Sequence, residues 1–204
     1  MKTRLNSNTA VAQGWIDANT SQPRKPATAK QINAFLDNHS TYYQAVHIDE
    51  ITSIGRVKSM QFVNNSLYSY GPHFTIARFA TTGTNATKVV LFTNRGFSSS
   101  TGQQKALTKR ALNAANIAYI EADNAQANCA SQHINNLLLL RKDIAAAHRK
   151  MMRATKRKSQ RATELTNAIR NHNNYVDAFV PTSQHWSDSD IEQDILVAVL
   201  QGGL

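Results

Sequence analysis

Cysteine is almost absent from this sequence, since only one of the 204 residues, Cys129, is a cysteine. A single cysteine excludes an internal disulfide and a cysteine-based metal cluster, so a reducing compartment suits the chain. No run approaches the roughly 20 apolar residues of a membrane helix, and the first residues lack the apolar stretch of a secretory signal. We therefore predict a cytoplasmic protein that neither spans a membrane nor is exported by that route.

The sequence also lacks the motifs of several chemistries. Its seven histidines show no zinc-helix spacing, and no His-x-Glu with Cys-x-x-Cys is present. The serines at 98–100 stand outside a Gly-x-Ser-x-Gly frame, and Cys129 has no flanking nucleophile signature. These absences predict no metal, no cofactor and no enzymatic activity.

Acidic residues are scarce, with 13 Asp and Glu against 23 Lys and Arg, which gives a net charge of +10. The excess is uneven: residues 141–170 hold ten basic and two acidic residues, whereas 171–204 hold five acidic residues and no Lys or Arg. Such a concentration of positive charge favours a polyanionic partner, with nucleic acid first and an acidic protein or membrane surface second.

Apolar periodicity predicts an α+β fold. Residues 54–93 alternate as strands of a small antiparallel sheet, with a hairpin turn at Asn64-Asn65, and residues 117–120 offer a further strand. A helix is expected over 101–116, with Thr101 and Gln104 in capping-box positions.

Composition divides the chain into four parts. Residues 1–27 are predicted to be a polar basic arm, 28–122 a small α+β domain, 123–180 a long basic amphipathic helix, and 181–204 an acidic C-terminal helix that packs on the rest. The apolar face of the long helix runs from Leu137 to Ile169 and must be covered by the sheet, by the C-terminal helix or by a second copy of the chain. A homo-oligomer through this helix is therefore one expectation.

The long helix carries the first candidate site. Between positions 149 and 161, seven of the thirteen residues are basic and none is acidic, and arginines recur at every fourth position. Like charges at that spacing repel, so a bound polyanion would remove a penalty. The predicted nucleic-acid-binding residues are Arg141, Lys142, Arg149, Lys150, Arg153, Lys156, Arg157, Lys158 and Arg161. Contacts to phosphates would give affinity without sequence preference.

The loop between the strand ending at Thr93 and the next helix is the second candidate. Hydroxyl groups and backbone amides at a helix N-terminus, beside basic side chains, are able to bind a phosphate, although ordinary helix capping explains the hydroxyls as well. The glycine spacing is not that of a Walker loop. The possible phosphate-binding residues are Arg95, Ser99, Ser100, Thr101 and Lys105.

Aromatic residues on the predicted strands allow two interpretations. They alternate near Arg56, Lys58 and Arg78, as a base-stacking sheet would require, but the same pattern is typical of a core, which we favour. The residues are Phe62, Tyr68, Tyr70, Phe74 and Phe79.

The segment from Leu67 to Ala77, with its Tyr-Ser-Tyr-Gly motif, resembles a segment of small bacteriophage proteins of unknown function. In those proteins this segment is followed by an aliphatic strand and then by an Asn. A Tyr-Ser pair and a Thr-Thr pair come next and begin a helix. Asn94, Phe97-Ser98 and Ser100-Thr101 stand in those places here, with Phe97 replacing the tyrosine and Gln104 standing where a histidine is usual. The resemblance implies a phage origin, and hence the host cytoplasm, but it carries no activity.

These observations lead to three hypotheses. The first is a phage-type basic accessory protein that contacts DNA or RNA non-specifically through the cationic helix face. The second is a protein–protein interaction factor, such as an inhibitor of a host protein or a virion component, that docks on an acidic surface. The third is a binder of a small phosphate-bearing ligand.

Overall fold

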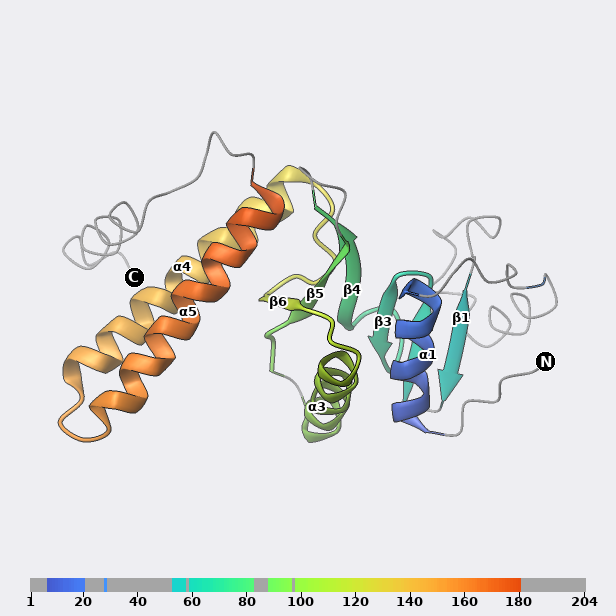
Figure 1. Ribbon diagram of the computed structural model, residues 1–204, viewed down its shortest axis with the longest axis horizontal. Helices are drawn as coiled ribbons and strands as arrows, with labels where there is room; N and C mark the ends of the chain where they lie inside the picture. Colours follow the sequence, from blue (N-terminus) through green and yellow to red (C-terminus); the bar gives the residue numbers. More distant parts are fainter. Residues whose placement is uncertain are drawn as a thin grey trace. The chain divides into compact units, whose positions relative to one another are not determined.

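A computed structural model describes residues 7–20, 28, 53–57, 59–82, 88–96 and 98–180 (Figure 1). The elements in chain order are α1 (Asn8–Thr20), β1 (Ile54–Val57), β2 (Met60–Val63), β3 (Ser66–Ser69), β4 (Thr75–Thr81), β5 (Lys88–Thr93), α3 (Ser99–Ala114), β6 (Tyr119–Ala122), α4 (Ala130–Arg153) and α5 (Lys158–Phe179). The strands form one six-stranded mixed sheet in sequence order. The predicted α+β class is confirmed. The sheet is mixed rather than wholly antiparallel, and α3 supplies the kind of helical connection that parallel strands require.

The described residues fall into two compact units. The first lies within Met1–Ala80 and Val89–Tyr119, and the second within Thr81–Lys88 and Ile120–Leu204. The predicted acidic helix at 181–204 lies outside the described residues.

Strands β1 to β4 of the first unit form the predicted antiparallel meander. β2 pairs with β3 so that Met60 lies opposite Ser69 and Phe62 opposite Leu67. Asn64 has a positive φ of 51° in the turn between them, a conformation that Asn tolerates better than most residues. The Asn64-Asn65 hairpin is therefore confirmed at the predicted place.

Helix α1 lies within residues 1–27, the predicted polar basic arm, where no helix was predicted. Residues 8–20 are helical, and Val11, Ala12, Trp15 and Ile16 are buried in the core of the first unit. The Trp15 ring lies 4.7 Å from Phe79, and its Nε1 donates to the backbone oxygen of Asn65 at 3.0 Å. These four buried residues form a short apolar face with i, i+1, i+4, i+5 spacing. The helix was not predicted because the surrounding residues are mostly Asn, Gln, Ser and Thr.

The strand aromatics mainly form a core. Phe62, Tyr68, Phe74 and Phe79 are at most 9% exposed, so they present no surface on which bases stack. Tyr70 is different, because it is 54% exposed in the turn after β3. The favoured core interpretation is thus confirmed for four of the five residues.

Helix α3 begins two residues earlier than predicted and has a different cap. Ser98 is the N-cap, and its hydroxyl accepts from the Thr101 amide at 3.4 Å. Gln104 is not the capping-box partner of Thr101, because it is buried and donates from Nε2 to the Ser59 backbone oxygen at 2.8 Å. Loss of this buried hydrogen bond would cost more free energy of unfolding than loss of a hydrogen bond at an exposed helix cap.

The second unit contains a long helix, α4 with 24 residues, but not one continuous helix through 123–171. α4 ends at Arg153, α5 begins at Lys158, and the two helices pack side by side (Figure 1). Leu140 and Ile144 on α4 are buried, as are Tyr175 and Val176 on α5. The chain therefore reverses direction in the middle of the predicted apolar face, and the part of that face on α4 packs against the part on α5.

Polar side chains fix the base of this helical hairpin. Tyr175 is fully buried, and its hydroxyl accepts from Asn136 Nδ2 at 2.9 Å and lies 2.6 Å from His133 Nδ1. Burial raises the pKa of Tyr175 to about 12. Asn171 bonds the backbone of Glu121 in β6 twice, at 2.7 and 2.9 Å. These bonds connect α4 to α5 and α5 to β6, and so help to set their register.

His172 makes the stability of this unit depend on pH. The side chain is fully buried, and burial, together with the positive charge of Arg141, lowers its pKa below 6.5. The folded state therefore binds fewer protons than the unfolded state, so stability should fall as the pH drops below about 6.5. Each unit between the folded and unfolded pKa is worth about 1.4 kcal/mol.

Thermal unfolding followed by helical circular dichroism between pH 8 and pH 5 measures this effect, with His172→Gln as the reference. We expect the melting temperature of the wild type to fall more steeply than that of the variant. The raised pKa of Asp143, caused by burial and by nearby Asp123, acts in the opposite direction at more acidic pH. Parallel pH profiles for the two proteins would exclude His172 as the sensitive group.

Candidate nucleic-acid interface

The turn between α4 and α5 forms one end of the helical hairpin (Figure 1), and the sequence at and beside this turn is rich in basic residues. The end of α4 contributes three, the four-residue turn two, and the start of α5 two. We call this group the cationic tip; its members are Arg149, Lys150, Arg153, Lys156, Arg157, Lys158 and Arg161. It holds seven of the nine predicted residues. Arg141 and Lys142 precede Arg149 by about two helical turns, roughly 10–12 Å along α4, and lie outside it.

The break at 154–157 changes the shape of the predicted site. A stripe along one continuous helix would have spread the arginines over more than three turns. Instead Arg149 and Arg153 lie on α4, Arg157 lies in the turn and Arg161 lies on α5. The chain reversal concentrates the same charges in a smaller volume, which increases both their mutual repulsion and their field on an anion.

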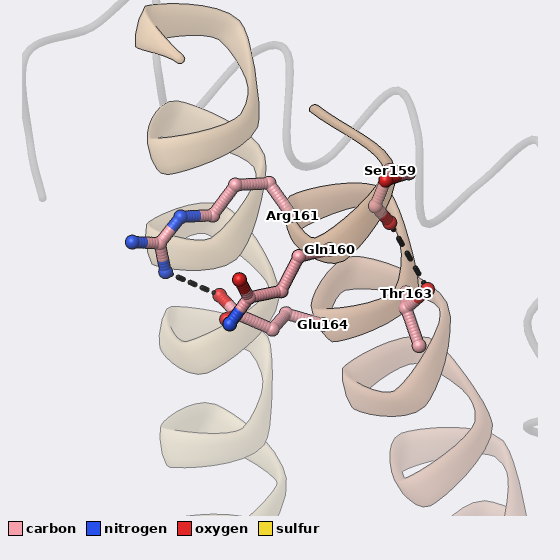
Figure 2. Close-up of polar contacts among 5 residues, drawn as sticks. All are labelled: Ser159, Gln160, Arg161, Thr163 and Glu164. Atoms are coloured by element: carbon pink, nitrogen blue, oxygen red, sulfur yellow. Dashed lines mark hydrogen bonds and ion pairs between the residues drawn. The ribbon is translucent and has the colours of Figure 1, made fainter. Parts of the chain in front are cut away.

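Five members of the cationic tip are exposed, and they are Lys150, Arg153, Lys156, Arg157 and Lys158. Arg149 and Arg161 are half-buried. Figure 2 shows that Arg161 is engaged within α5, where its Nη1 lies 2.6 Å from Glu164 Oε2. Glu164 also accepts a bond from Gln160 Nε2 at 3.4 Å. Arg161 is therefore partly neutralised, and the five exposed residues are the stronger candidates.

The two helix ends at the tip differ electrostatically. Lys150 and Arg153 lie in the last turn of α4, where they complement the negative end of the helix dipole. The first turn of α5 has no acidic residue, and its N-cap, Arg157, makes no side-chain capping bond. Cations beside the positive end of a helix are unfavourable. A bound anion would reduce that repulsion and would accept hydrogen bonds from the backbone amides of the first turn.

Arg157 also has a strained backbone, with φ 60° and ψ 33° in the left-handed region. Arg157→Gly removes the Cβ responsible for the strain, so the second unit should become more stable by a few tenths to about 1 kcal/mol. The same change removes one cation and should weaken polyanion binding severalfold. Thermal unfolding and a binding titration measure the two effects.

Lys158→Gln is the matched control, because it removes a neighbouring cation without changing the backbone. Relief of repulsion alone would raise the stability of both variants equally. A gain for Arg157→Gly beyond that of Lys158→Gln is the expected result, and equal gains would show that φ strain at Arg157 costs nothing.

The second predicted site is divided by the structure. Thr101 is buried, with its hydroxyl 3.3 Å from Ser69 Oγ, and Ser100 Oγ lies 2.8 Å from Ser98 Oγ. These two residues belong to the capping network of α3. Arg95, Ser99 and Lys105 instead line an open hollow, together with Lys109. Sequence reasoning missed Lys109, although its place four residues after Lys105 indicated a shared helix face.

No family model, curated protein or solved structure matches the chain. Among the described residues, no group of three or more His, Cys, Asp and Glu side chains is placed to hold a metal ion. Within the same part of the chain, no helix is both long and apolar enough to cross a membrane.

Proposed function

We propose that the chain is a basic accessory protein that binds nucleic acid without sequence preference through the cationic tip. The observation that carries this proposal is the chain reversal at 154–157, which puts five exposed cations beside an uncapped helix N-terminus. Closely spaced lysines and arginines of this kind neutralise phosphates and release counterions.

The composition of the tip favours contacts to the nucleic-acid backbone over contacts to the bases. Residues 149–161 contain no aromatic side chain on which an unstacked base would lie. Lysine and arginine contacts to phosphate fix position and carry no sequence information directly. DNA and RNA, single- and double-stranded, should therefore bind with similar affinity.

A second candidate partner is an acidic protein surface, and Met152 favours it. This side chain is 69% exposed amid the basic residues at the end of α4. Exposed methionines suit protein surfaces because the thioether adapts to varied apolar contacts. A protein partner would gain from burying Met152, whereas a phosphate backbone would not.

The resemblance around the Tyr-Ser-Tyr-Gly segment adds a setting to the proposal. In the structure this segment is the end of β3 and the turn after it, where Gly71 has a φ of 132° and a Cβ would come within 3.2 Å of His73 Nδ1. A glycine is therefore required at that turn. On this resemblance we propose that the protein acts during phage infection, in the host cytoplasm.

Fluorescence anisotropy with four labelled 20-mers of scrambled sequence tests the proposal, using single- and double-stranded DNA and RNA at low salt. Labelled polyglutamate serves as a protein-like polyanion. We expect saturable binding of all four nucleic acids within about tenfold of one another, and weaker binding of polyglutamate. Binding of polyglutamate alone would favour the acidic-protein partner, and no binding of any probe would refute both candidates.

A further inference from the structure

The first unit contains a hollow of about 490 Å³ at the junction of β5 and α3. The loop after β5 supplies Arg95, and the first turns of α3 supply Ser99, Gly102, Lys105, Ala106 and Lys109. Three of the lining residues are basic and none is acidic. A hollow of this size accommodates a ligand of several to a few tens of atoms.

Neighbouring groups hold the two lysines in place. Lys105 Nζ donates to the backbone oxygen of Arg95 at 2.6 Å. The ammonium groups of Lys105 and Lys109 lie 6.0 and 5.1 Å from the centroid of the buried Phe92 ring, and Lys109 also lies 5.5 Å from that of Tyr119. Cation–π contacts therefore position both charges at one wall of the hollow before any ligand binds.

Gly102 is a second, independent indication that the hollow binds a ligand. It lies in the first turn of α3, where a glycine costs up to about 1 kcal/mol relative to alanine. No atom of the described chain lies within 4 Å of a Cβ built on it. Packing thus does not require a glycine at this position. Its effect is to leave the wall of the hollow bare, so that a ligand can approach the helix backbone beside the basic side chains.

We propose that this hollow binds the phosphate group of a small phosphomonoester. Arg95, Lys105 and Lys109 supply the positive charge, and the positive end of the α3 dipole points in the favourable sense for an anion. The volume leaves room for the organic part of the ligand. The residues of this site are different from those of the cationic tip and belong to the other unit of the chain.

Gly102→Glu is the sharpest test. The new carboxylate would extend into the hollow and pair with the lysines, while an acidic residue in the first turn of α3 should stabilise the helix. A loss of binding in a more stable protein cannot be attributed to unfolding. Gln103→Glu adds the same charge at the next, exposed position, which does not line the hollow, and is the matched control.

Isothermal titration with adenosine 5′-monophosphate, adenosine and inorganic phosphate provides the readout. A protein whose cationic tip is neutralised by glutamine substitutions serves as the background, so that the tip contributes no binding. We expect one saturable site for the monophosphate, none for adenosine, and a loss of about tenfold or more in Gly102→Glu but not in Gln103→Glu. Arg95→Ala with Lys105→Ala should show a similar loss.

Inorganic phosphate distinguishes the source of the ligand. Weaker binding of phosphate than of the monophosphate would show that the organic group occupies the hollow, and equal binding would identify the phosphate alone as the ligand. The proposal is overturned if no probe binds saturably, or if Gly102→Glu binds the monophosphate as tightly as Gln103→Glu does.

Discussion

Neutralising the exposed part of the cationic tip should lower the affinity for a 20-base-pair DNA by roughly two to three orders of magnitude at low salt. Each contact between a cation and a phosphate releases condensed counterions, so the loss of several contacts together has a large effect. The variant carries Lys150→Gln, Arg153→Gln, Lys156→Gln, Arg157→Gln and Lys158→Gln. Anisotropy titrations of variant and wild type, under identical salt, measure the ratio.

The matched control removes cations elsewhere on the same helical hairpin. Lys142→Gln with Arg170→Gln changes two exposed basic residues outside the tip, and we expect a loss of less than about fivefold from the smaller net charge. All the substituted side chains are exposed, so circular dichroism should show the same helix content in each protein. Equal affinity of wild type and five-residue variant would place the binding surface elsewhere.

Among the substitutions considered, replacement of Trp15 should produce the largest loss in free energy of unfolding. The indole is fully buried, packs on Phe79 and donates a hydrogen bond to Asn65. Trp15→Ala removes those contacts and leaves a cavity, and such changes cost about 3–5 kcal/mol in free energy of unfolding. Urea denaturation followed by circular dichroism measures the difference.

Gln13→Ala provides the reference on the same helix. Gln13 is exposed, and its Nε2 donates to Asp17 Oδ1 one turn further along α1 at 2.8 Å, so its loss should change stability by less than about 0.5 kcal/mol. A Trp15→Ala variant that loses under about 1 kcal/mol would show that α1 does not complete the core of the first unit.

Local sequence signals were sufficient for the strands and for α3. The Asn64-Asn65 turn and the alternation around it predicted the β2–β3 hairpin, because turn chemistry and side-chain period both act over a few residues. The same locality explains the error at α1. Its apolar face has only four members among polar neighbours, and the contacts that stabilise it come from β1, β2, β3 and α3, which are distant in the sequence.

The break between α4 and α5 could not be read from the sequence. Residues 154–157 contain neither Gly nor Pro, and Arg157 adopts the left-handed conformation that usually marks a glycine. Packing of the two apolar halves on each other overrides the local preference for one helix. The basic residues of the site were predictable from composition, but their gathering at a tip depends on this tertiary reversal.

The dependence of DNA affinity on salt tests the role of the cationic tip most directly. The slope of log K against log salt counts the phosphates neutralised, at about 0.9 per contact for duplex DNA. If each of the five exposed residues contacts one phosphate, the slope for the five-residue variant should be shallower than that of the wild type by about 4.5. Identical slopes for the two proteins would contradict phosphate binding by the tip.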